Sequence, residues 1–216
     1  MKAVLAAALL LCACGGATSV SDNPSVQDLA PERDTAIVHV PLFIRDAAGQ
    51  IPTDPAALVY EARLGNPVLA RDGHQLTLAE FNAPRGRASV KCVERGTHAV
   101  LELTGLIPFG VYTVWNVVFR APGFDPSFAN LIALGAIGES DGSQNSFVAD
   151  STGAGSVSAI TPGGPLSAFG SIAGCALAGE FEFHLVGAYH IDGRTHGETP
   201  GAAGTFVEQF GFMFKR

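Results

Sequence analysis

The stretch GVYTVWNVVF, residues 110–119, decides the fold class of this 216-residue chain. Successive side chains of an extended strand point to opposite faces, so Trp115 and Tyr112 would lie on different faces. Both faces of this stretch are apolar, which is typical of a strand at the centre of a sheet. The stretch therefore predicts a central β-strand with Trp115, the single tryptophan, in the core.

Further strand patterns lie on both sides of this stretch. The alternation of apolar and polar residues predicts strands at 37–45, 89–93, 97–106, 156–160, 180–191 and 205–214. The chain holds 26 glycines and 13 prolines and shows no long helical pattern. We expect an all-β fold, an antiparallel two-sheet β-sandwich of seven to nine strands, either immunoglobulin-like or jelly-roll.

Local residue patterns predict the secondary structure of two other segments. In residues 54–65, Asp54 is a helix cap candidate and Gly65 a stop signal, although the middle of the segment also suits a strand. We favour one short helix there, and at most one in the fold. Residues 121–150 are rich in glycine, proline, serine and aspartate, which predicts a long loop.

The composition suits a packed domain. Only 15% of the residues are charged and 47% are hydrophobic, which disfavours disorder. The net charge of −7 argues against a nucleic-acid partner.

The N-terminus predicts export. A basic start is followed by an apolar run, residues 3–11, that is too short to span a bilayer. Residues 11–14, LCAC, resemble the bacterial lipobox. The resemblance implies that residues 1–13 are a lipoprotein signal peptide and that Cys14 carries the lipid. An ordinary signal peptide, cut near Ala13 or Ala17, is the alternative.

The remainder of the chain is then divided into a tether and a domain. Residues 14–34 are small and polar, as in a lipid-anchored flexible tether, and residues 35–216 form a single β-sandwich domain. The lipid would hold the protein on a membrane of the bacterial cell envelope. Because Gly15 replaces the aspartate that signals inner-membrane retention in this class, we expect the outer membrane, with the domain facing the periplasm or the cell surface.

Two cysteines, Cys92 and Cys175, are left once the signal and the lipidated residue are set aside. An even pair in an exported chain predicts a disulfide. It would close a loop of roughly 84 residues and stabilise the fold by about 4–5 kcal/mol in the chain-entropy model.

Candidate chemistry gathers after the strand at 180–191. Tyr189, His190, Asp192 and His196 surround one loop and form a candidate ligand-binding site. If the loop folds back, His190, Asp192 and His196 could hold zinc or copper. The alternative is a plain turn at Asp192. His184 would lie about 20 Å from His190 along the strand, although it could share an ion with Glu182.

Catalytic motifs give weaker support for a function than the histidine loop does. No nucleophile elbow occurs, and the carboxylates of Glu180 and Glu182 are better explained as a solvated sheet face than as a glycosidase pair. We therefore name no catalytic residue. A sugar platform would require Tyr112 or Trp115 at the surface.

Two segments, residues 96–119 and 184–201, resemble those of secreted and lipoprotein-type bacterial proteins of uncharacterised function. The resemblance implies a secreted β domain and no activity. We expect a lipid-anchored envelope protein whose domain serves non-catalytic binding or structure, with a protein or glycan partner and no cofactor. A zinc- or copper-binding protein or metalloenzyme that uses the 189–196 loop is the alternative.

Overall fold

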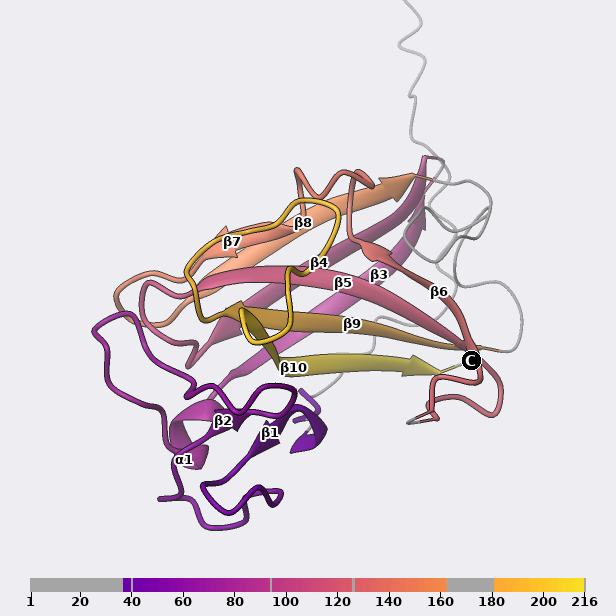
Figure 1. Ribbon diagram of the computed structural model, residues 1–216. Coiled ribbons are helices and arrows are strands. Elements are labelled where there is room, and N and C mark those ends of the chain that lie inside the picture. The colour runs from indigo at the N-terminus through magenta and orange to yellow at the C-terminus, as the bar shows by residue number, and fades with distance from the viewer. Residues whose placement is uncertain (1–36, 40, 94, 126, 163–180, 216) are drawn as a thin grey trace, which may run out of the picture.

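The computed structural model describes residues 37–39, 41–93, 95–125, 127–162 and 181–215. Ten strands in three antiparallel sheets and one short α-helix make up this part of the chain (Figure 1). The predicted all-β class with antiparallel pairing is confirmed. The structure describes ten strands, more than the predicted seven to nine. Two of the ten, of two residues each, account for the excess.

The largest sheet has five strands, in the order β10-β9-β5-β6, with β7 paired to β5. The strand β5 contacts β9 on one edge and both β6 and β7 on the other, so its predicted central place is confirmed. Trp115 is 4% exposed. The bounds are Val111–Arg120 for β5, Leu131–Ala136 for β6, Ser146–Val148 for β7, Phe181–His190 for β9 and Phe206–Lys215 for β10.

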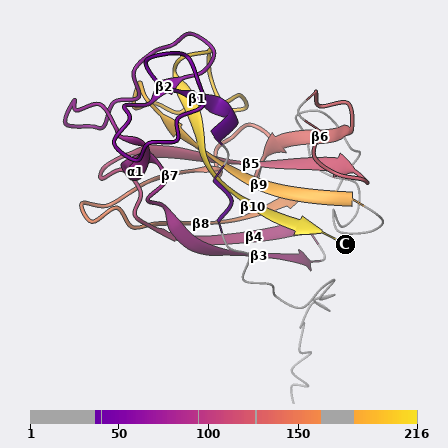
Figure 2. The ribbon, with the colours of Figure 1, turned by 90° about the horizontal axis from the view of Figure 1, so that it is seen from below.

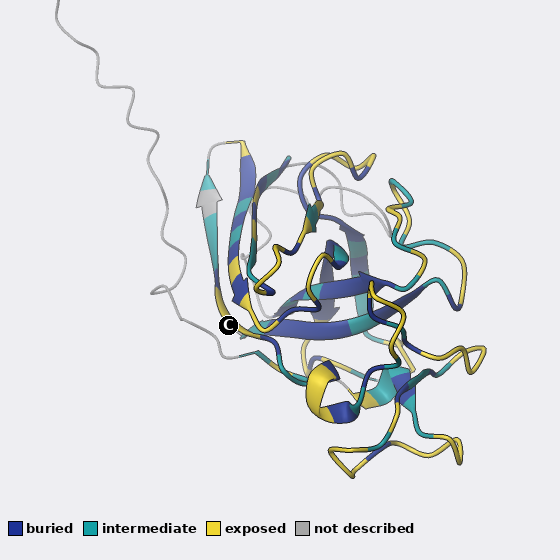
Figure 3. Ribbon diagram, turned by 90° about the vertical axis from the view of Figure 1, so that its left-hand side faces the viewer, coloured by how far each residue is buried: buried dark blue, intermediate teal, exposed yellow. Residues whose placement is uncertain are grey.

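A second sheet has the order β3-β4-β8, with bounds Arg85–Val93, Gly96–Thr104 and Gly155–Pro162. Figure 2 shows β3, β4 and β8 in one layer and β5, β9 and β10 in another. One hydrophobic core joins the two layers, since it contains Leu101 and Val157 from the smaller sheet and Leu185 and Phe210 from the larger. Buried residues follow the strands, while exposed ones follow the loops (Figure 3).

A small subdomain of turns lies at one end of the layers (Figure 1). It holds the 3₁₀ turn η1 (Pro41–Phe43), the paired strands β1 (Ile44–Arg45) and β2 (Tyr60–Glu61), and α1 (Leu78–Phe81). The helix begins at a capping box, in which the Thr77 side chain accepts from the Glu80 backbone and the Glu80 side chain accepts from the Thr77 backbone.

Three local predictions were wrong. Residues 54–65 hold turns and β2 instead of a helix, because the Asp54 carboxylate accepts from the Ala56 amide in a turn. Residues 121–150 contain β6 and β7, which are held by pairing to β5. The predicted strand at 37–45 is reduced to β1, because Pro41 begins a 3₁₀ turn.

The predicted signal peptide, Cys14 and the tether lie outside the described residues. So does Cys175, and with it the predicted disulfide to Cys92. Within the described ranges, no helix combines the length and the apolar character needed to cross a membrane.

Candidate metal site

The end of β9 and the loop that follows bring together His190, Asp192 and His196. One ligand atom of each residue lies within 4.8 Å of the others. His196 Nε2 is 3.0 Å from Asp192 Oδ2, and the two imidazole rings are 5.7 Å apart at their centroids. The convergence that the metal hypothesis required is therefore present.

A tight turn produces this convergence. The Gly193 amide donates to the His190 carbonyl at 3.0 Å, with Gly193 in the left-handed conformation at φ 71°. The Asp192 carboxylate accepts from the Arg194 amide at 3.1 Å. The chain then returns His196 to the side of Asp192, and the two side chains are each 30% exposed.

His190 is fixed from beneath by β5. Its side chain is fully buried, and its Nε2 lies 2.8 Å from Thr113 Oγ1. The same hydroxyl accepts from Trp115 Nε1 at 2.9 Å. Within the described residues, His190 Nδ1 has no hydrogen-bond partner. Metal-binding histidines generally donate their other ring N–H to a fixed acceptor, so a proton on Nε2 would leave Nδ1 with a lone pair for an ion.

Burial also sets the charge of His190. It lowers the pKa of this imidazole from 6.5 to about 4, with the Asp192 carboxylate opposing and His196 assisting the shift. The ring is therefore neutral at pH 7, which is the form that coordinates metals.

Tyr189, the fourth predicted residue, lies on the opposite face of β9. Its hydroxyl donates to the Leu69 carbonyl at 2.7 Å, and burial raises its pKa to about 12. The structure does not bring it to the other three.

Glu182 and His184 lie at the far end of β9 and belong to a separate cluster. Their side chains are 2.5 Å apart, as the shared strand face predicted. Tyr112 and Trp115 are 0% and 4% exposed, so the sugar platform that would need either of them at the surface is excluded.

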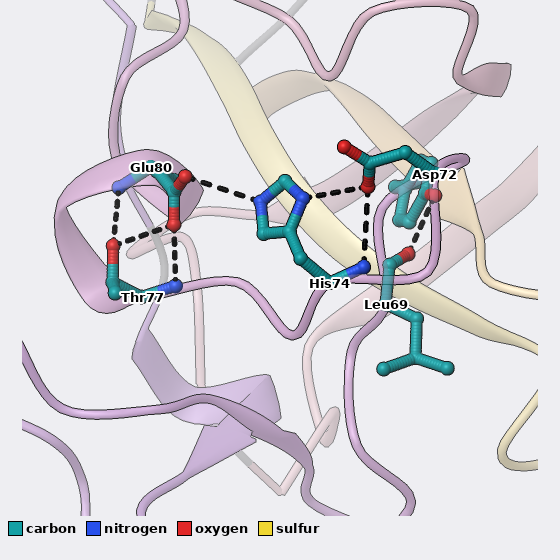
Figure 4. Close-up of polar contacts among 6 residues, drawn as sticks. Leu69, Asp72, His74, Thr77 and Glu80 are labelled. Carbon is teal, nitrogen blue, oxygen red and sulfur yellow. Dashed lines mark hydrogen bonds and ion pairs between the residues drawn. The ribbon is translucent and has the colours of Figure 1, made fainter.

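Sequence reasoning missed a second histidine cluster, which is next to α1 (Figure 4). His74 lies between Asp72, at 2.6 Å, and Glu80, at 3.2 Å. Glu80 also accepts from the Thr77 amide at 2.8 Å. The Thr-x-x-Glu capping signature marked this place in the sequence. Both ring nitrogens of His74 have partners, and the cluster is explained by the local cap.

The chemistry of the His190 cluster follows from its donors. Two imidazole nitrogens and one carboxylate oxygen suit zinc and copper. Three protein ligands leave one position of a tetrahedral ion for water or a substrate. In comparisons with known proteins, no family model, no curated protein and no solved structure matches this chain.

Proposed function

We propose that this protein binds a divalent zinc or copper ion through His190, Asp192 and His196. The observation that carries the proposal is the fully buried His190, whose Nδ1 has no hydrogen-bond partner among the described residues and which offers a ligand atom within 4.8 Å of those of the partly exposed Asp192 and His196. Buried polar atoms normally have partners, so an unsatisfied nitrogen at a ligand cluster has a simple explanation in an ion.

The cluster requires only a small closure to bind. Tetrahedral ligands at about 2.0–2.1 Å from zinc lie roughly 3.4 Å from one another. The His196–Asp192 pair, at 3.0 Å, is already near this spacing. His190 is held by Thr113 and packed strands, whereas Asp192 and His196 lie on an exposed turn. The turn can therefore close on a fixed first ligand.

The cellular location of the protein is a separate part of the proposal. Residues 11–14 support a lipid on Cys14 and a place in the cell envelope. Incorporation of labelled palmitate by the wild-type chain, retained in Cys12→Ala and lost in Cys14→Ala, is the expected result. Equal labelling of all three chains would exclude Cys14 as the acceptor.

The arrangement of the sheets as a two-sheet sandwich is likewise a proposal. The shared core of the two larger sheets supports the two-sheet sandwich. Contacts between Leu101 of β4 and Leu185 of β9, measured by NMR in solution, would test the face-to-face packing of the two sheets.

Metal titration of the purified full chain tests the main proposal. After chelator treatment, calorimetry and elemental analysis should show one zinc or copper ion per chain. His196→Ala and Asp192→Asn should each weaken the affinity by about 100-fold or more, since each removes one of three ligands. At zinc 100 times above the dissociation constant, the free energy of unfolding should rise by about 2.7 kcal/mol.

His74→Ala is the matched control. His74 also has two carboxylate neighbours, so it reports ion binding by an ordinary surface cluster. Unchanged affinity in this variant, together with loss in His196→Ala, supports the proposal. Absence of stoichiometric uptake, or wild-type uptake by His196→Ala, overturns it.

A further inference from the structure

The face of the largest sheet that points away from the shared core carries a cavity of about 450 Å³. Its floor is apolar and includes Trp115 and Val117 of β5, Val186 and Ala188 of β9, and Phe206 of β10. Small-molecule sites in proteins have volumes of about 300–1,000 Å³ and mostly apolar walls. The cavity has the size and lining of such a site.

Two distant segments form its walls. On one side, Val38 exchanges two backbone hydrogen bonds with Gly211, at 2.8 and 3.0 Å, and leads into η1. On the other side, the Glu182 carboxylate accepts from the Phe124 amide at 3.3 Å and from His184. These bonds hold both walls at the edges of the apolar floor.

Large apolar side chains are exposed where these walls meet solvent. Val38, Phe124 and Phe128, which all line the cavity, are 39%, 41% and 44% exposed. Phe128 has φ 59°, a strained conformation for a bulky residue. Such strain is common at ligand clamps. Exposed aromatic residues at the mouth of an apolar hollow indicate a surface that an apolar ligand would cover.

The charges on the wall select the head group of the ligand. The Arg63 guanidinium is 2.8 Å from Glu208 and 3.7 Å from Glu61, so two carboxylates already share this cation. Glu208 Oε2 is buried and has no hydrogen-bond partner among the described residues, and burial raises the pKa of this carboxyl while Arg63 opposes the rise. This end of the cavity therefore disfavours an anion and offers an acceptor to a hydrogen-bond donor.

The separation along β9 between the two ends of the cavity indicates the length of the ligand. Glu208 pairs with Ala188 across β10 and β9, and His184, which lines the other end, precedes Ala188 by four residues. This separation is about 13 Å, which matches an extended alkyl chain of roughly ten carbons.

We propose that the cavity binds a neutral long-chain apolar molecule that carries a hydroxyl-type donor at the Glu208 end. The floor supplies the apolar contact, the aromatic rim closes over the chain, and Glu208 accepts from the head group. The cavity adjoins the metal cluster through Trp115 and Phe206 but shares no lining residue with it, and the proposal does not depend on a bound ion.

Trp115 is the only tryptophan, and it lies in the cavity floor, so its fluorescence reports occupancy directly. We would titrate the full chain below detergent-like concentrations with three matched ligands: 1-decanol, decanoate and decyl methyl ether. Saturable binding of one decanol per chain is expected. Decanoate should bind at least about tenfold more weakly because of its charge, and the ether several-fold more weakly because it has no donor.

Variants of the floor and rim complete the test. Val186→Phe fills the floor and should weaken decanol binding by about tenfold or more, and Phe128→Ala should weaken it several-fold. Phe109→Ala is the matched control, because Phe109 is also exposed, also has positive φ, and does not line the cavity. Thermal unfolding identifies any variant that fails to fold. If Val186→Phe fails to fold, Phe128→Ala still tests the cavity, because Phe128 is at an exposed position.

The proposal is overturned by absence of decanol binding, by equal affinity for decanoate, or by wild-type affinity in Phe128→Ala and Val186→Phe. A dimer seen by light scattering that excludes decanol from the cavity also overturns it. His196→Ala must still bind decanol, which separates a failure here from a failure of the metal proposal.

Discussion

The His190 and His74 clusters contain the same kinds of side chain and behave oppositely. His190 is buried, has one ring nitrogen without a partner among the described residues, and has a lowered pKa. His74 is exposed, has partners on both nitrogens, and has a raised pKa, chiefly because of its hydrogen bond to Asp72. Each cluster has three such side chains, two histidines and one carboxylate around His190 and one histidine and two carboxylates around His74, so their total number does not separate the clusters.

The difference shows which of the two clusters would gain from binding an ion. The His74 cluster is satisfied by its own helix cap and gains little from an ion. The His190 cluster has a buried nitrogen without a hydrogen-bond partner in the described part of the chain, so an ion there would satisfy a group whose burial is otherwise unfavourable. The following four predictions test this contrast, from the largest expected effect to the smallest.

Replacing each histidine by alanine should separate the clusters most clearly. His190→Ala removes a fully buried ring and leaves a void, so we expect a loss of about 2–4 kcal/mol in the free energy of unfolding. His74→Ala should cost less than about 0.5 kcal/mol, because its ion pairs are exposed. Denaturant unfolding of the metal-free protein measures both. Equal losses would refute the contrast.

Thr113→Val tests the support beneath His190. The change keeps the shape of the side chain but leaves Trp115 Nε1 and His190 Nε2 without their shared oxygen. Stability should fall by about 1–3 kcal/mol. The proposed zinc affinity should fall by about 10–100-fold, because the hydroxyl orients a ligand. Thr104→Val, at an exposed position, is the control for both measurements. Unaltered zinc affinity would show that Thr113 does not position His190.

Thr77→Ala breaks the other cluster at its cap. The Glu80 amide loses its acceptor and the capping box is removed, which should cost about 1 kcal/mol in thermal or denaturant unfolding. Zinc affinity should not change, since Thr77 is neither one of the three ligands nor a hydrogen-bond partner of His190. A loss of zinc affinity in this variant would mean that the two clusters are coupled.

The pH dependence of His74 gives the smallest effect. A folded-state pKa raised above 6.5 means that its ion pairs stabilise the fold fully below the unfolded value and that this contribution is lost as pH rises through the folded value. The stability difference between wild type and His74→Gln should therefore be larger near pH 5.5 than near pH 8.5, by up to about 0.5 kcal/mol. A difference that grows with pH would contradict the assigned partners.

The strands with strong alternation were predictable from the sequence. The stretches that became β4, β5, β9 and β10 were all recognised, because the two-residue period appears in the order of residues. The strands β6 and β7 were not, because LIALGA and SFV have weak patterns of their own and are held by β5. Their stability comes from a partner that is distant in the sequence.

The candidate site divides in the same way. The turn at Asp192-Gly193 and the proximity of His196 follow from local chemistry, and the sequence indicated them. The contact of Thr113 with His190 joins residues 77 positions apart, and no local pattern signals it. The cavity depends on such contacts throughout, since Arg63 meets Glu208 across 145 positions.

By itself the sequence determined the local features of this protein: the strand periods, the tight turn after β9 and the residues that surround it. These depend on a few neighbouring side chains and their backbone preferences. Only the tertiary structure decided that one nitrogen of His190 has no partner among the described residues and that an apolar hollow lies on the outer face of the sheet. Burial and hydrogen-bond satisfaction are properties of packing between distant segments, and they separate His190 from His74 although the two residues are chemically identical.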